Sequence, residues 1–362
     1  MFKQLKNFTL QVITGANIAT IAVMLMIGYS DRINPVSHGY LANVGLLFPV
    51  FMALNMGFLI FWVLFRPRRV FIPVIGYLLC YAPVRAYMPF NPTSDVPQGA
   101  IKVMSYNVWN FAGWSSPPGT DNEILTYLRQ QRADILCLQE ASDGEVGKAR
   151  VNAALDTIYP YKRIEQLSTS ETIALYSRYP ILSSEPIEYL PENYQSIAYR
   201  LKIDGDTIIV INNHLESTGF SQEEKERFRT LVKGEMKARQ ARHESSLVIH
   251  KLAKASAKRA PQADALARYI SNHSDKSIIV CGDFNDSPIS YTHHKTAQNL
   301  TDCFIVTGNG PGISYHRNGF FVRIDNIMCS KDWEPYNCHV DNKIKISDHY
   351  PIYCWLKRRA IP

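Results

Sequence analysis

The residues with the clearest chemical potential are Asp348 and His349, in the segment Ile346-Ser347-Asp348-His349-Tyr350-Pro351. An aspartate beside a histidine places a metal-type carboxylate next to an imidazole that can handle protons. Three other polar clusters come earlier in the chain, each at the end of an apolar run: Ser105-Tyr106-Asn107, Leu138-Gln139-Glu140 and Gly282-Asp283-Phe284-Asn285. We therefore expect the four clusters to form one site.

The apolar runs that precede these clusters have the composition of buried strands. They are short and rich in β-branched residues, and they cover residues 101–106, 134–138, 207–211, 276–281 and 324–329. Side chains at the ends of such strands can be held rigidly over a common cleft. Helical segments such as 121–131 alternate with the strands, which predicts two facing sheets covered by helices.

The side chains of the four clusters favour metal-assisted hydrolysis of a phosphate ester. Carboxylate and amide oxygens are hard ligands that suit Mg2+ or Mn2+, and no Cys/His cluster has the spacing of a zinc site. A divalent ion neutralises the phosphate and stabilises the charge that develops during in-line attack. Two histidines, His214 and His349, would supply proton chemistry or further phosphate contacts.

The ordered set of motifs resembles the endonuclease/exonuclease/phosphatase superfamily, over about residues 100–357. The resemblance rests on Asn107, Glu140, Asn213-His214, GDFN at 282–285, RID at 323–325 and SDH at 347–349. It implies an α/β (α+β) two-sheet sandwich of the deoxyribonuclease-I-like type, flanked by helices. In this chain an all-α transmembrane region would precede the sandwich.

The resemblance also implies a metal site and a water site. Glu140 would bind the catalytic metal, with Asn107 and Asp348 completing or flanking its ligand shell. Asp283 would activate or position the attacking water, and Asn285 would hold the phosphate or the same water. Taken alone, the aspartate and asparagine of this last pair could simply be turn formers that close a strand.

Two histidines complete the roles that the resemblance implies. His349, oriented by Asp325, would contact the scissile phosphate. His214 would act from the opposite side as a phosphate ligand or general acid, and Glu171 is its expected partner. The non-enzymatic alternative is a membrane-anchored binding protein, which would have lost an essential group, whereas all of these groups are present.

The N-terminal part of the chain is typical of a membrane protein. Residues 12–29 and 41–65 carry no charge, and each is long enough for a bilayer core, which takes about 20 residues. A third run, at 70–88, contains two prolines and an arginine and is a poorer candidate. We predict a membrane region at 1–88 with two or three transmembrane helices, an extended tether at 89–99, and the catalytic domain at 100–362.

Basic residues predict the topology of this region. Lys3 and Lys6 favour a cytoplasmic N-terminus, and Arg66-Pro67-Arg68-Arg69 favours a return to the cytoplasm after the second span. We expect the third run to cross, with Arg85 snorkelling to the interface. The catalytic domain would then lie outside the cytoplasm on a bacterial-type plasma (inner) membrane. A re-entrant third run would leave the domain inside.

A basic insertion at 221–270 separates the strand of His214 from the strand of Asp283. It favours helices, and its lysines and arginines account for much of the formal net charge of +7. A solvated helical pair is one interpretation. The other is a surface for anions, either nucleic-acid phosphates or anionic lipid headgroups, although aromatic residues that would stack on single-stranded bases are sparse.

These features predict a divalent-metal-dependent phosphoesterase that hydrolyses phosphodiester bonds at a membrane surface, with nuclease-type activity favoured. The alternative is a lipid-directed phosphoesterase, either sphingomyelinase-like or inositol-phosphate phosphatase-like, because one site serves all of these substrates in the superfamily. The expected partners are a nucleic acid or a phospholipid headgroup, together with the lipid bilayer. No protein partner can be inferred from the sequence.

Overall fold

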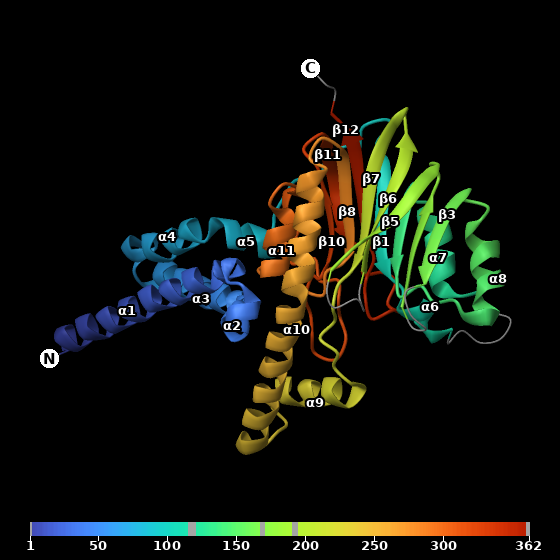
Figure 1. Cartoon of the computed structure of the whole chain (residues 1–362). Helices are drawn as coiled ribbons and strands as arrows, with labels where there is room; N and C mark the ends of the chain where they lie inside the picture. The colour runs from blue at the N-terminus through green and yellow to red at the C-terminus, as the bar shows by residue number, and fades with distance from the viewer. Residues whose placement is uncertain (1, 115–120, 167–170, 190–194, 360–362) are drawn as a thin grey trace.

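The computed structural model describes residues 2–114, 121–166, 171–189 and 195–359. Two six-stranded sheets face each other, helices cover their outer faces, and the N-terminal helices project from one side (Figure 1). The expected two-sheet sandwich with flanking helices is therefore confirmed.

The first sheet has the strand order β11-β12-β1-β2-β4-β3. At its centre β1 (Ile101–Asn107) runs parallel to β2 (Ile135–Gln139). Its other strands are antiparallel to their neighbours, and they are β3 (Tyr161–Gln166), β4 (Thr172–Ser177), β11 (Trp333–Val340) and β12 (Ile352–Arg358).

The second sheet has the strand order β5-β6-β7-β8-β10-β9. Here β7 (Asp206–His214) and β8 (Ser277–Asp283) form the parallel pair. The remaining strands are β5 (Ile181–Ile187), β6 (Gln195–Ile203), β9 (Thr301–Asp302) and β10 (Asp325–Cys329). All five strands expected from the sequence are present, and Asn107, His214 and Asp283 are each the last residue of a strand.

Apolar side chains from both sheets fill the space between them, among them Val103, Ile135, Val210 and Ile279. A polar contact crosses this core close to the strand ends. Gln139 Nε2 donates to Asn212 Oδ1 over 2.6 Å, and Asn212 Nδ2 donates to the carbonyl of Leu138 over 3.1 Å. This contact fixes the two sheets relative to each other next to the polar clusters.

Helices cover the two outer faces. The first sheet is covered by α6 (Trp109–Gly113), α7 (Glu123–Gln131) and α8 (Gly144–Leu155), and the second by α10 (Ala238–Asn272) and α11 (Tyr291–Ala297). The basic insertion folds into α9 (Gln222–Val232) and the first part of α10, which continues through Pro261. A short helix, α12 (Cys303–Thr307), packs against β11.

The N-terminal region consists of α1 (Phe2–Gly28), α2 (Pro35–Ala42), α3 (Phe48–Phe65), α4 (Phe71–Leu79) and α5 (Tyr81–Tyr87), with short 3-10 turns η1 (Ser30–Arg32), η2 (Val44–Leu47) and η3 (Pro67–Arg69) between them. Two stretches, Gln4–Arg32 and Pro35–Phe65, are long and apolar enough to cross a membrane. The third run is bent by 70° between α4 and α5.

Two parts of this region contact the catalytic domain. Residues 89–99 form no helix or strand, but they are fastened to the catalytic domain: Asn91 Nδ2 donates to the carbonyl of Gly308 over 2.6 Å, and Lys357 Nζ donates to the carbonyl of Gln98 over 2.9 Å. Arg85 donates to the carbonyl of Ile305 over 2.9 Å, so it binds the catalytic domain. The segment is extended, but it is not a loose linker.

Candidate active site

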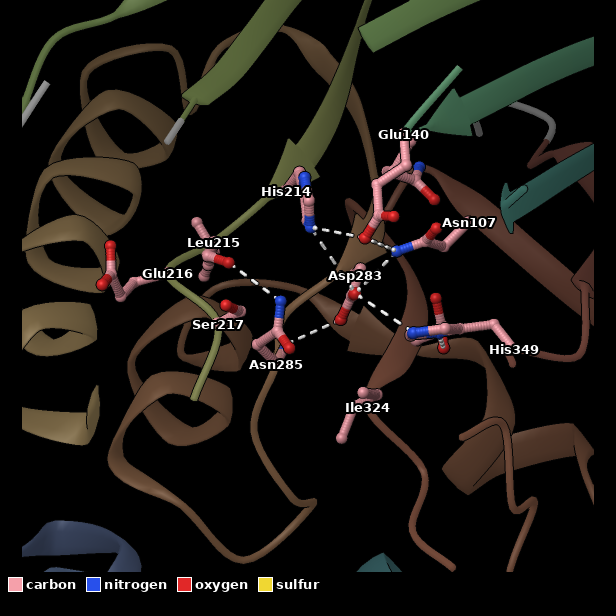
Figure 2. Close-up of polar contacts among 12 residues, drawn as sticks. Asn107, Glu140, His214, Leu215, Glu216, Ser217, Asp283, Asn285, Ile324 and His349 are labelled. Carbon is pink, nitrogen blue, oxygen red and sulfur yellow. Dashed lines mark hydrogen bonds and ion pairs between the residues drawn. The ribbon is translucent and has the colours of Figure 1, made fainter. Parts of the chain in front are cut away.

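The predicted polar clusters meet at one end of the sandwich, around Asp283 (Figure 2). Asp283 ends β8, lies opposite His214 in the parallel pair with β7, and lies opposite Asp325 in the antiparallel pair with β10. Gly282 makes this arrangement possible, because it has a φ of 131° and a Cβ there would collide with the backbone of Asn213. The glycine of the GDFN motif thus lets two strands approach each other beneath the site.

Asp283 is only 1% exposed and is contacted from several directions. Its Oδ1 accepts a hydrogen bond from the backbone N–H of Asn285 over 2.8 Å, and its Oδ2 accepts one from Asn107 Nδ2 over 3.2 Å. The Nε2 atoms of His349 and His214 lie 3.6 and 3.9 Å from Oδ2. Both imidazoles and an amide therefore surround one carboxylate.

Burial raises the pKa of Asp283, and nearby Asp325 raises it further, whereas His349, His214 and the Asn285 amide lower it. The net result is a pKa of about 6. A carboxylate with this pKa is ionised at neutral pH and is a stronger base than an exposed aspartate. This is the range in which a general base works best.

His349 is held by a buried carboxylate. Its Nδ1 lies 2.8 Å from Asp325 Oδ2, and both side chains are almost completely buried. Burial lowers the pKa of the imidazole, but the charges of Asp325, Asp283 and Asp348 and the hydrogen bond to Asp325 outweigh it and raise the pKa to about 10. His349 is therefore a cation at neutral pH.

His214 has the same arrangement with a different partner. Its Nδ1 lies 3.0 Å from Glu171 Oε2, the partner expected from the sequence, and its Nε2 lies 3.7 Å from Glu140 Oε1. Burial again lowers the imidazole pKa, while the hydrogen bond to Glu171 and the charges of Glu140 and Asp283 raise it to about 9. The site thus holds two cationic imidazoles on either side of Asp283.

The two predicted amide residues are both hydrogen-bonded. Asn107 Nδ2 donates to Glu140 Oε1 over 3.0 Å, while its Oδ1 accepts from the backbone N–H of Trp109 over 3.1 Å. Asn107 therefore presents its nitrogen to the carboxylates, and a metal bound through its oxygen would require the amide to rotate. Asn285 has a φ of 52°, and its Nδ2 donates to the carbonyl of Leu215 over 2.9 Å.

A cavity of about 240 Å³ lies over these groups, and four carboxylates line it: Glu140, Asp283, Asp286 and Asp348. The pKa of the Tyr315 phenol is raised first by burial and then by the negative charges of Asp348, Asp283 and Glu140. Converging carboxylates with so much negative charge fit a hard divalent cation. Asp283, Asp325 and His349 also have ligand atoms within 4.8 Å of one another, but Asp325 is engaged with His349 Nδ1.

All nine predicted site residues therefore lie at this end of the sandwich. Sequence reasoning missed other residues that line the cavity, including Leu46, Phe220, Lys225, Tyr315 and Phe320. Tyr315 packs edge-on against the His349 ring, with 5.1 Å between ring centroids. None of these residues belongs to a recognisable motif, and they reach the site only through long-range packing.

Comparison with known proteins agrees with this geometry. The model of the Endonuclease/Exonuclease/phosphatase family matches residues 104–349, and a domain of unknown function matches residues 10–87. No curated protein matches the sequence.

Two solved structures have the same fold. Truncated Caenorhabditis elegans TDP2 has a TM-score of 0.51 and 16% identity, covering 72% of this chain and 99% of its own. The human Nocturnin catalytic domain, with bound sulfate, has a TM-score of 0.50 and 18% identity, covering 74% of this chain and 96% of its own. At these identities the likeness shows the fold alone.

Proposed function

Since the chain belongs to the endonuclease/exonuclease/phosphatase family and is a phosphoric ester hydrolase, we propose that it cleaves phosphodiester bonds at a membrane surface with the aid of a divalent cation. The observation that carries the proposal is the position of Asp283, a buried and basic carboxylate between two imidazolium groups. A base flanked by two cations suits the attack of water on an anionic phosphate.

In this proposal Asp283 accepts the proton of the attacking water. The backbone N–H of Asn285 and the amide of Asn107 hold the two carboxylate oxygens, so the group cannot rotate away. Asn285 lines the same cavity, where it can hold the water or a phosphate oxygen. A positioned general base contributes about 10²–10⁴-fold to the rate.

In this scheme His349 binds the phosphate and His214 protonates the leaving oxygen. His349, fixed by Asp325, places a cationic N–H toward the non-bridging phosphate oxygens. His214, fixed by Glu171, faces the site from the side of Glu140 and can donate its Nε2 proton to the leaving oxygen. Both groups are protonated at neutral pH because of their raised pKa values.

Glu140 and Asp348 are the residues proposed to hold the cation, with Mg2+ or Mn2+ as the candidate. When bound, such an ion neutralises phosphate charge and stabilises the leaving oxygen. Asn107 positions Glu140 through its 3.0 Å hydrogen bond. Removing the cation should leave the fold intact, because two apolar outer clusters and an inner core hold the sandwich together.

The membrane region supports a topology with the catalytic domain outside the cytoplasm. The end of the bundle that is remote from the domain carries Arg66, Arg68 and Arg69, and Arg69 Nη1 donates to Thr14 Oγ1 on α1 over 2.6 Å. From there α4 and α5 return to the domain end, where Arg85 binds Ile305 (Figure 1). Cytoplasmic arginines would therefore place the domain on the opposite side.

The test is hydrolysis of bis(p-nitrophenyl) phosphate by the full chain in detergent, after treatment with EDTA and return of Mg2+ or Mn2+. We expect p-nitrophenol release that disappears with EDTA and is restored by either ion. Release that is unaffected by EDTA would refute the metal dependence. No release with any divalent ion would refute the phosphodiesterase proposal.

A further inference from the structure

Near its start, the second candidate membrane span (Pro35–Phe65) forms a junction with the catalytic domain beside the active site. Gly45 in η2 packs so closely on Ile289 that a Cβ at this position would collide with the Ile289 carbonyl oxygen. Ile289 follows the GDFN motif by four residues, and it is buried in one apolar cluster with Met24, Ile27 and Phe48 of the membrane region. We call residues 284–289, which follow β8, the catalytic loop. This loop and the membrane helices therefore share a core.

A chain of polar contacts strengthens this junction. Asn43 Oδ1 accepts a hydrogen bond from Ser256 Oγ over 3.0 Å, and Ser256 Oγ accepts one from Arg259 Nη2 over 3.0 Å. Arg259, which is 1% exposed, pairs with Asp286 through a 3.2 Å contact. Asp286 is the residue after Asn285, so hydrogen bonds connect the membrane region to the catalytic loop without interruption.

The same junction forms part of the wall of the catalytic cavity. Glu140, Asp283, Asp348 and His349 line the cavity, and Leu46 from η2, Leu252 and Phe320 line it as well. The cavity therefore combines charged groups that can hold a phosphate with apolar side chains, one of which comes from the membrane region.

Packing holds the aromatic part of this wall in place. Phe320 stacks on Phe228 of α9 with 3.9 Å between ring centroids, and on Phe220 with 5.4 Å. The basic insertion therefore stabilises the wall of the cavity, because α9 supplies one of the rings that stack on Phe320.

Resting on the proposed function, we propose that the substrate is an amphiphilic phosphoester, whose phosphate lies at Asp283 and whose apolar chain lies along Leu46, Leu252 and Phe320. The bilayer is the source of this substrate, because η2 is itself part of the candidate span Pro35–Phe65. Burial of several methylene groups on these side chains contributes affinity that a water-soluble phosphodiester lacks.

The charges around the cavity argue against a nucleic acid as the preferred substrate. Among the described residues that line it, the lysines and arginines are Lys225 and Arg259. Arg259 is engaged with Asp286, and Lys225 lies over the ring of Tyr315 at 5.6 Å. A polyanion is normally bound by several cationic side chains that follow its backbone. In this cavity apolar side chains occupy the positions where such cations would be expected.

The experiment uses the full chain in detergent with three p-nitrophenyl phosphodiesters whose second ester group is methyl, butyl or octyl. All three share one leaving group, so their kcat/KM values report recognition of the alkyl chain. We expect kcat/KM to rise by at least about tenfold from methyl to octyl. Leu46→Asn should reduce this rise to less than about threefold, and Leu252→Asn, made on the catalytic-domain side of the wall, should do the same.

Leu47→Asn is the matched control, because Leu47 is the 50% exposed neighbour of Leu46 in η2 and does not line the cavity. It should keep the wild-type dependence on chain length. Equal kcat/KM values for all three esters, or the same loss in Leu47→Asn as in Leu46→Asn, would overturn the inference and leave the phosphodiesterase proposal intact. Failure to hydrolyse even the methyl ester would refute the proposed function itself.

Discussion

Nδ1 of His349 lies 2.8 Å from Oδ2 of Asp325, and Nε2 of the same ring lies 3.6 Å from Oδ2 of Asp283. The imidazole is thus fixed at one nitrogen by a carboxylate on β10, while its other nitrogen faces the centre of the site. Because Asp325 and Asp283 are opposite each other in the β8–β10 pair, the register of two strands sets the direction of this ring.

Asp325→Asn is therefore expected to lower kcat by about 10²–10⁴-fold and to change KM much less. The amide removes the charge that orients His349 and raises its pKa. Steady-state kinetics with bis(p-nitrophenyl) phosphate separates the two constants.

The chain offers a matched control for this variant. His293 Nε2 lies 2.7 Å from Asp302 Oδ2 in a second buried pair of the same kind, and neither residue lines the catalytic cavity. Asp302→Asn should lower the melting temperature but leave kcat within about twofold of wild type. Equal losses of kcat in the two variants would mean that Asp325→Asn lowers kcat only by destabilising the fold.

The pair of His214 and Glu171 predicts a shift in the pH profile. The hydrogen bond to Glu171 is one of the causes that raise the pKa of His214 to about 9. Glu171→Gln removes this charge, so the His214 pKa falls and the imidazole loses its proton at a lower pH. The alkaline limb of the kcat/KM profile should then move to lower pH, and an unchanged limb would exclude His214 as the acid.

The raised histidine pKa values also predict how the metal-free protein responds to pH. The pKa of His349 rises from 6.5 to about 10 on folding, so its stabilising contribution is complete below pH 6.5 and is lost as pH rises through 10. In EDTA, the difference in melting temperature between wild type and His349→Gln should shrink between pH 7 and pH 10. A difference that stays constant over this range would contradict the assignment of a charged imidazole.

Glu140 is expected to control the affinity for the cation. Glu140→Gln removes a charged ligand, and the Mg2+ concentration for half-maximal activity should rise by at least about tenfold. Metal titrations of activity measure this value. Glu185→Gln serves as a control because Glu185 pairs with Arg200 on β6, away from the cavity, and it should keep the wild-type requirement. If Glu140→Gln needs the same Mg2+ concentration as wild type, Glu140 does not bind the cation.

The parts of the fold that depend on local pattern were predictable from the sequence. Short β-branched runs marked five strands, and three of these strands end on the polar residues Asn107, His214 and Asp283, which follow the runs within three positions. The partner of His214 was also foreseen, since Glu171 lies 3.0 Å from its ring. Strand ends converge in a sandwich, which explains why motifs recognised by their order in the sequence lie close together in the structure.

Features that depend on contacts between distant segments were not predictable. The uncharged run at 41–65 lies within the single candidate span Pro35–Phe65, as expected, but the close packing of Gly45 on Ile289 was not foreseen. Arg259 was counted only as part of a basic insertion, whereas it is buried and paired with Asp286. Neither hydrophobic periodicity nor charge reveals which residues from separate elements will pack together.

The most direct test of the account is the kcat of Asp283→Asn at saturating Mg2+, measured with the full chain and bis(p-nitrophenyl) phosphate. The asparagine keeps the shape of the side chain but cannot accept a proton, and it removes a buried charge whose ionisation is opposed by burial. We expect a loss of at least about 10³-fold in kcat, with a melting temperature no lower than that of wild type. A variant that folds and keeps more than about a tenth of the wild-type kcat would contradict the role of Asp283 as the base.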